Sequence, residues 1–163
     1  MDRTTYPIHS TNDGFEYLFI SEGIRGNILK GISIEYIPDD QPHFLRPIYN
    51  LAFGDAKLVG DNWALNDSVR SGNGDMPKVI ATVVKVAVEF LTRHKNATLS
   101  FQGYLDEKSL AMGKNQRNIL YQRAIDSNWD ELSVKFCFWG AKTGKFEEYS
   151  IGNQHERILV KLK

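Results

Sequence analysis

The sequence has 163 residues, of which 42% are hydrophobic and 25% charged, and its 20 Lys+Arg balance its 20 Asp+Glu. This composition excludes an intrinsically disordered chain, and a net charge of zero argues against binding nucleic acid or anionic membranes by overall charge alone. The charge is unevenly spread, because residues 1–67 hold 5 Lys+Arg and 10 Asp+Glu whereas residues 68–163 hold 15 and 10. The functional interpretation of this uneven distribution is a molecule with one basic side. The alternative is that the charges simply lie on ordinary solvated faces.

Cysteine, histidine and apolar content exclude several further classes. The single cysteine, Cys137, excludes an intrachain disulfide, and between Phe136 and Phe138 it is typical of a small buried hydrophobe rather than a nucleophile. The four histidines have no close spacing to other ligands, so we expect no metal. No apolar run reaches the roughly 20 residues that span a bilayer, and the start lacks a secretory signal. We therefore expect a cytoplasmic protein without membrane contact.

Alternating apolar residues predict three strands in the first third of the chain. Residues 15–20 and 27–37 have a period of two and are joined by a turn with two glycines, so we expect a hairpin. Residues 48–53 form the third strand, which a Gly-Asp pair closes. Residues 60–75 are rich in Gly, Asn, Asp and Ser, which predicts a long loop with a short strand at 63–65.

The clearest predicted helix begins after Asp75, a residue type that caps helix N-termini, and carries Pro77 in its first turn. Apolar residues follow at helical spacing in two adjacent stripes, so the helix should lie across a sheet. The stripes are Val79, Val83, Val86 and Phe90, and Ile80, Val84, Ala87 and Leu91. Residues 97–101 then predict a short strand.

The last third predicts one more helix and three more strands. Residues 115–127 have an apolar side and form the second helix. Residues 132–139 alternate apolar and polar side chains, which predicts a strand, and residues 142–145 predict the hairpin turn to a return strand at 146–151. Residues 158–162 alternate again and form the last strand.

Together these elements predict a single α+β domain over residues 1–163. Its sheet should be twisted and mostly antiparallel, with about six to eight strands and two main helices packed on it. The sequence has no internal repeat, low-complexity tract or linker.

In order and spacing, several segments resemble a family of small, uncharacterised bacterial proteins, and the resemblance covers nearly the whole chain. It implies no activity. An insertion-like stretch at 106–114 is a departure from the pattern. The segments are Phe19-Ile20-Ser21-Glu22-Gly23 with Gly26, Tyr49-Asn50-Leu51-Ala52-Phe53-Gly54-Asp55, Asn73-Gly74-Asp75 with Lys78-Val79-Ile80-Ala81-Thr82-Val83, Arg117 with Leu120-Tyr121 and Ile125, and Leu159-Val160-Lys161.

A weaker, distant similarity is to the second half of the Gcn5-related acetyltransferase fold. It rests on the helix–strand–helix order and on the run Asn115-Gln116-Arg117-Asn118-Ile119-Leu120-Tyr121. The resemblance implies a helix N-terminus that cradles the pyrophosphate of coenzyme A. The glycine loop of that fold is one residue longer than the run from Arg70 to Gly74, and Asp75 at the helix start would repel a phosphate.

The second helix carries the most basic segment of the chain. Lys114, Arg117 and Arg123 come without Asp or Glu between residues 108 and 125, and Tyr121 is one helical turn after Arg117. This pattern predicts phosphate contacts with Tyr121 stacked on a base. The alternative is a solvated face with Tyr121 packed on the sheet.

Two smaller candidate sites lie elsewhere. Gly72 and Gly74 allow backbone N–H groups to converge on an anion, although a flexible loop before a helix cap is the plainer interpretation. Glu22 and Asp55 would form a carboxylate pair suited to acid–base work if the first and third strands were neighbours. A turn-forming Asp55 is the alternative.

The preferred function is a non-enzymatic binding module that contacts nucleic acid or a protein partner through the basic helix or the sheet, with no cofactor. The alternative is an acyl-coenzyme A-dependent N-acyltransferase or a degenerate relative of one, and whether the chain is an enzyme stays open. The last strand, ending at Lys163, is a candidate edge for pairing two copies into a homodimer.

Overall fold

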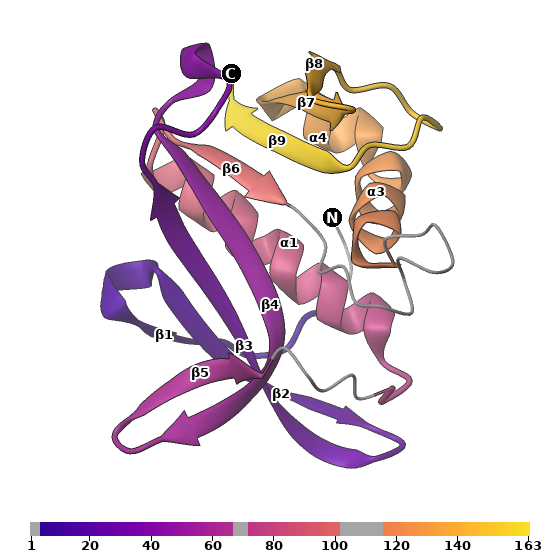
Figure 1. Cartoon of the computed structure of the whole chain (residues 1–163). Coiled ribbons are helices and arrows are strands. Elements are labelled where there is room, and N and C mark those ends of the chain that lie inside the picture. Colours follow the sequence, from indigo (N-terminus) through magenta and orange to yellow (C-terminus); the bar gives the residue numbers. More distant parts are fainter. Residues whose placement is uncertain (1–3, 67–71, 102–115) are drawn as a thin grey trace.

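The computed structural model describes residues 4–66, 72–101 and 116–163, with the backbone alone at residue 66 and at residues 116–120. These residues form a nine-stranded open sheet with three helices packed on one of its faces (Figure 1). The α+β class and the mostly antiparallel sheet are confirmed. The sheet has one strand more than the upper expectation, and the described residues form three helices rather than two.

The N-terminal half builds one side of the sheet from strands joined by tight turns. The strands β1 to β4 are successive antiparallel neighbours, and β5 pairs with the far end of β4. The third predicted strand does not end at Phe53, because β4 runs on to Val59 to pair with β5. The elements are β1 (His9–Thr11), β2 (Glu16–Gly23), β3 (Gly26–Ile37), β4 (Ile48–Val59) and β5 (Asn62–Asn66), with 3-10 turns at Asn12–Gly14 and His43–Leu45.

Helix α1 (Met76–Arg93) lies in the crossover that runs from β4 through β5 to β6 (Thr98–Phe101), and β4 with β6 is the one parallel strand pair among the described residues. A parallel pair needs a long crossover, and the 18-residue helix supplies it. Its two predicted apolar stripes face the sheet, with Val83, Val86 and Phe90 fully buried. The ladder between β4 and β6 begins at Ile48 and ends at Leu51, beyond which β4 turns toward β5.

The C-terminal half completes the sheet in the order β6-β9-β7-β8. Strand β9 lies between β6 and β7, so both of its edges are already paired and the homodimer predicted through the last strand is wrong. The elements are α3 (Gln116–Ser127), α4 (Trp129–Lys135), β7 (Phe136–Lys142), β8 (Lys145–Glu148) and β9 (Arg157–Leu162).

The strand predicted at 132–139 is half wrong, because its first residues form helix α4. Leu132 and Phe136 are buried four residues apart, a spacing that fits one face of a helix as well as one face of a strand. Val134 decides between the two, since its side chain is 69% exposed and cannot belong to the alternating core face.

The core lies between the sheet and the helices and is built mostly from aromatic and branched side chains. Cross-strand neighbours such as Tyr17, Ile32 and Phe53 share the helix-facing side and are almost fully buried. In the part of the chain that the structure describes, no helix is both long and apolar enough to cross a bilayer.

Candidate functional site

The segment before α1 is locked into the turn of the β2–β3 hairpin. Asn73 is only 3% exposed. Its backbone carbonyl accepts a hydrogen bond from the N–H of Ile24 at 3.0 Å, and its side-chain Oδ1 accepts one from the N–H of Arg25 at 2.7 Å. Its side-chain amide donates to Ser21 Oγ at 2.9 Å and to the carbonyl of Gly26 at 3.1 Å. A Cβ on Gly23 would lie 2.0 Å from the Asn73 carbonyl oxygen, so glycine is required there.

Asp75 is the N-cap residue of α1, but its side chain makes no capping hydrogen bond to the helix. Its carboxylate accepts hydrogen bonds from the hydroxyl groups of Tyr6 (2.5 Å) and Ser21 instead. The Tyr6 hydroxyl also accepts a bond from the backbone N–H of Glu22 at 3.0 Å. The network therefore ties the N-terminal segment, β2 and the start of α1 together. We define Tyr6, Ser21, Asn73 and Asp75 as the hinge network.

These contacts shift two pKa values in opposite directions. Burial and the hydrogen bond to Asp75 raise the pKa of Tyr6, so the phenol stays protonated and donates. Burial works to raise the pKa of Asp75, but the hydroxyl groups of Ser21 and Tyr6 outweigh it, and the pKa of that carboxyl is lowered. The positive charge of Lys30 adds to the lowering.

An ion pair continues this polar region along the sheet. Lys30 and Asp55 are cross-strand neighbours on β3 and β4, each under 10% exposed, with Nζ 2.5 Å from Oδ1. Asp55 is thus a strand residue and not a turn residue. The predicted pair of Asp55 with Glu22 does not form, because β3 separates β2 from β4 and Glu22 lies on the opposite face of the sheet.

The two glycines predicted to bind an anion have different surroundings. Gly74 is exposed, with a φ of +79° that favours glycine, and the position of its missing Cβ lies 3.6 Å from Ile24. Gly72 is exposed, with nothing near its α-carbon that would exclude a side chain. Beside them, the backbone and amide of Asn73 are committed to the hairpin, and Asp75 adds negative charge at the helix start.

The basic helix exposes only part of its predicted surface. Tyr121 is 4% exposed and its ring packs against Phe53 and Phe101, so the interpretation of this ring as stacked on a base is replaced by its alternative, packing on the sheet. Arg123 is exposed. Arg117 lies in α3 with its backbone alone described, and Lys114 lies outside the described residues.

Large aliphatic side chains are most exposed at the ends of two hairpins. Ile24, at the β2–β3 turn, is 84% exposed, and Leu58, near the β4–β5 turn, is 74% exposed; no other large hydrophobic residue in the described part of the chain exceeds them. Val59 beside Leu58 is 54% exposed. Exposed apolar side chains at projecting turns are accessible to a partner, although the two hairpin ends are separate and do not form one patch.

The comparison with protein families gives a match that covers nearly the whole chain. The pattern of DUF6934, a family of unknown function, matches residues 2–163. The chain belongs to this family. Comparison with curated proteins and with solved structures gives no match. The resemblance to a family without known activity is thereby confirmed, and the DUF6934 pattern spans the hinge network, the basic helix and both hairpins.

In this DUF6934 member, α3 is held to the loop between β8 and β9 by buried polar contacts. Gln122 donates to the carbonyl of Asn153 at 2.5 Å and accepts from the backbone of His155 at 3.0 Å. Tyr149 donates to Asp126 at 2.7 Å, and burial together with this bond raises the pKa of Tyr149. Burial lowers the pKa of His155. These groups fix the helix and leave Arg123 on its outer side.

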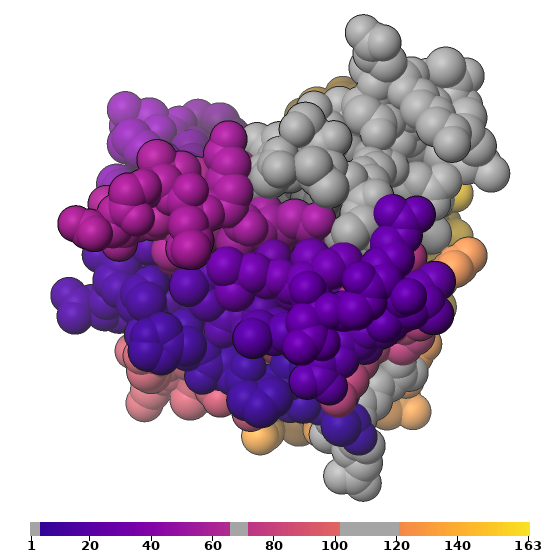
Figure 2. Space-filling model, turned by 90° about the horizontal axis from the view of Figure 1, so that it is seen from below, coloured from indigo at the N-terminus to yellow at the C-terminus, as the bar shows by residue number. Residues whose placement is uncertain are grey.

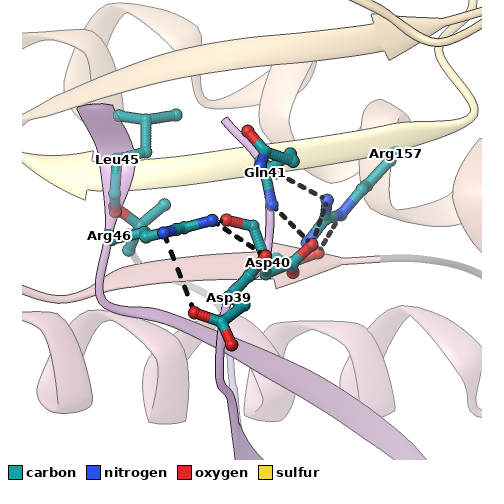
Figure 3. A network of polar contacts seen from close by, with 8 residues as sticks. Asp39, Asp40, Gln41, Leu45, Arg46 and Arg157 are labelled. Atoms are coloured by element: carbon teal, nitrogen blue, oxygen red, sulfur yellow. Dashed lines mark hydrogen bonds and ion pairs between the residues drawn. The ribbon is translucent and has the colours of Figure 1, made fainter. Parts of the chain in front are cut away.

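A second polar network holds the loop between β3 and β4 against the helix-free face of the sheet (Figure 3). Arg157 of β9 donates to Ser100 Oγ at 2.6 Å and pairs with Asp40. Arg46 reaches the carbonyl of Asp40 at 2.7 Å from within the loop. The loop thus packs its Leu45 against Ile48 and Leu159 in a small apolar cluster on that face.

Sequence reasoning missed the roles of Tyr6, Ser21 and Lys30. One signal was available, since polar Ser21 and Lys30 interrupt the apolar face of β2 and β3 at the positions where the core row would continue. The partner of each lies on a distant segment, which a strand pattern does not reveal. Cys137, predicted to be buried, is partly exposed.

Proposed function

We propose that this protein is a non-enzymatic binding module whose partner is another protein chain. The observation that carries the proposal is the position of Ile24 and Leu58, the two most exposed large hydrophobic side chains, at the ends of two hairpins. Apolar side chains of this size stabilise a complex when they leave water, by roughly 25 cal/mol per Å² of area buried. Tyr121, the aromatic side chain expected to stack on a base, packs in the core, which weakens the nucleic-acid version.

The polar residues give an independent reason for a structural rather than a catalytic role. The hydroxyl of Ser21 and the carboxylate of Asp75 bond each other, Asn73 and Tyr6, so the hinge network uses its own donors and acceptors to join three segments. Such closed networks rigidify a fold. A rigid base beneath the β2–β3 hairpin would hold Ile24 in a fixed position for a partner.

The test is affinity capture from an extract of the source organism with the tagged chain and three variants. Ile24→Ser and Leu58→Ser remove the exposed side chains at the two hairpin ends, and Val134→Ser removes a side chain of similar exposure from α4 as the matched control. The proposal expects a protein retained by the unmodified chain and by the control and lost from at least one hairpin variant. Equal retention by all variants would overturn it.

The nucleic-acid version is tested beside it by fluorescence anisotropy with single- and double-stranded oligonucleotides at low and physiological salt. Salt-sensitive binding that Arg123→Ala weakens and Leu58→Ser leaves unchanged would replace the protein partner with nucleic acid. Lys95→Ala, on the turn after α1, is the control for loss of one positive charge.

One observation favours the alternative, an acyl-coenzyme A-dependent N-acyltransferase. Among the described elements, α1, β6 and α3 follow one another in the helix–strand–helix order on which that similarity rests, and β6 runs parallel to β4. Against it, Asp75 places a carboxylate at the start of α1, and Pro77 removes one N–H from its first turn. A thermal shift with acetyl-coenzyme A that Gly74→Leu abolishes would favour the transferase. If acetyl-coenzyme A produced no thermal shift, the transferase alternative would be excluded.

A further inference from the structure

In the part of the chain that the structure describes, one edge of strand β5 is unpaired, and the strand lacks the protection that the outermost strands have. Among the described strands it pairs with β4 alone. The outermost strands are β1, with three residues, and β8, which carries Lys145, Glu147 and Glu148. Short length and charge are the usual ways to prevent edge pairing. The five residues of β5, Asn62-Trp63-Ala64-Leu65-Asn66, contain no charge and no proline.

The sequence of β5 is nearly symmetric about Ala64. In an antiparallel pair centred on this residue, Ala64 stands opposite Ala64 of the second strand, Trp63 opposite Leu65, and Asn62 opposite Asn66. Trp63 and Leu65 share one face of the strand, so two copies would place four apolar side chains side by side. A two-fold interface requires such self-complementarity, because the same patch meets itself.

The position of the hairpin makes this edge available. The β4–β5 hairpin leaves the main sheet and forms a projection at the margin of the molecule (magenta in Figures 1 and 2). Trp63 anchors it, since its ring lies so close over Gly31 that a Cβ there would be 2.3 Å from the ring. Leu58, the cross-strand neighbour of Trp63, adds an exposed aliphatic side chain to the same face.

We propose that a second copy of this chain pairs with β5, antiparallel and centred on Ala64, so that the two sheets continue across a two-fold axis. This inference rests on the proposed function, because it names the protein partner of the β4–β5 hairpin. The partner is a second copy because the apolar pattern of β5 complements itself, and the like charges that this register would bring together, Asp61 of one copy and Asp67 of the other, lie outside the strand.

A charge-swap experiment tests the proposal. Sedimentation equilibrium of the unmodified chain over a wide concentration range is expected to show a monomer–dimer equilibrium. Ala64→Lys and Ala64→Glu each place like charges opposite one another at the axis, so each variant alone should be monomeric. An equimolar mixture of the two variants should dimerise again, because Lys and Glu would then face each other at the axis. Variants that had failed to fold could not restore the dimer on mixing. Ser10→Lys, the same change on edge strand β1, is the matched control and should leave the dimer intact.

Three results would overturn the inference: a monomer at every concentration, a dimer that both Ala64 variants retain, or a mixture that stays monomeric. The proposed function is judged separately by the capture experiment. If the chain is monomeric and still retains a protein that Leu58→Ser releases, the self-pairing fails and the binding module stands. If it dimerises through β5 and no other protein is retained, the second copy is the partner.

Discussion

The hinge network and the β4–β5 hairpin differ in which side chains they bury and which they expose. At the start of α1, polar groups are turned inward and bond one another across three segments of the chain. On the hairpin, the apolar Leu58 and Val59 are turned outward. Buried polar groups that satisfy each other hold a fold together, whereas exposed apolar groups lower their free energy only when something covers them. The polar residues of the hinge network thus have a structural role, and we propose that the functional surface is the apolar one.

The largest effect should come from breaking the buried ion pair beside the hinge network. Lys30→Met leaves the Asp55 carboxylate without this partner in the interior, so we expect a loss of about 3–5 kcal/mol in the free energy of unfolding, measured by urea denaturation. The double variant Lys30→Met with Asp55→Leu removes both charges and should recover much of the loss. A double variant less stable than the single one would contradict this account of the pair.

A smaller loss is expected for Asp75→Ala, which removes the acceptor for the hydroxyl groups of Tyr6 and Ser21. Because Asp75 is partly exposed, we expect a decrease of about 1–3 kcal/mol in unfolding free energy at neutral pH. Asp61→Ala, in the exposed β4–β5 turn, is the control and should change it by less than about 0.5 kcal/mol.

The same variant tests the charge of Asp75 through pH. The pKa of this carboxyl is lowered in the folded state, so its contribution is present above its unfolded value of about 3.9 and is lost as pH falls through the folded value. The stability difference between the unmodified chain and Asp75→Ala should therefore shrink below about pH 4. A difference that stays constant with pH would show that the charge contributes nothing.

The contact between the hairpin and the sheet can be broken at Gly31. In Gly31→Ala the new Cβ would meet the Trp63 ring at 2.3 Å, so the ring must move and we expect a loss of about 1–3 kcal/mol. If β5 pairs with a second copy, the displaced hairpin should also weaken the dimer. Gly72→Ala, where nothing lies within 4 Å of the added carbon, is the matched control. Equal stability of the two variants would argue against the anchoring role of Trp63.

The smallest effect on stability should follow from the exposed hairpin ends. Leu58→Ser and Ile24→Ser remove side chains that contact mostly water, so the free energy of unfolding should change by less than about 0.5 kcal/mol. Partner capture should nevertheless be lost in at least one of the two variants. A variant that loses several kcal/mol would show that these side chains support the fold and would weaken the argument for a binding surface.

Local patterns in the sequence predicted the elements whose signals are local. The hairpin at residues 15–37 and the helices at 76–93 and 116–127 follow from periodicity, glycines and a proline near a helix start. Helix α4 was missed because Leu132 and Phe136 fit both a strand and a helix, and only the exposure of Val134 separates them. The place of β9 between β6 and β7 depends on long-range pairing, which periodicity does not carry.

The candidate site was predicted less well for a physical reason. Asp75 has the sequence position of a helix cap, yet its carboxylate bonds Ser21, 54 residues away. Tyr121 and Arg123 are two residues apart on one helix, and tertiary packing buries the first while leaving the second exposed. Which side of a helix faces the sheet, and which distant hydroxyl group meets a carboxylate, is set by the assembled fold rather than by neighbouring residues.

Amide hydrogen exchange at low and high protein concentration tests the central claim most directly. If the chain contacts a second copy through the β4–β5 hairpin, exchange in β5, at residues 62–66, should slow as concentration rises, while exchange in α3 stays unchanged. Protection that grows in α3, or no dependence on concentration in β5, would contradict it.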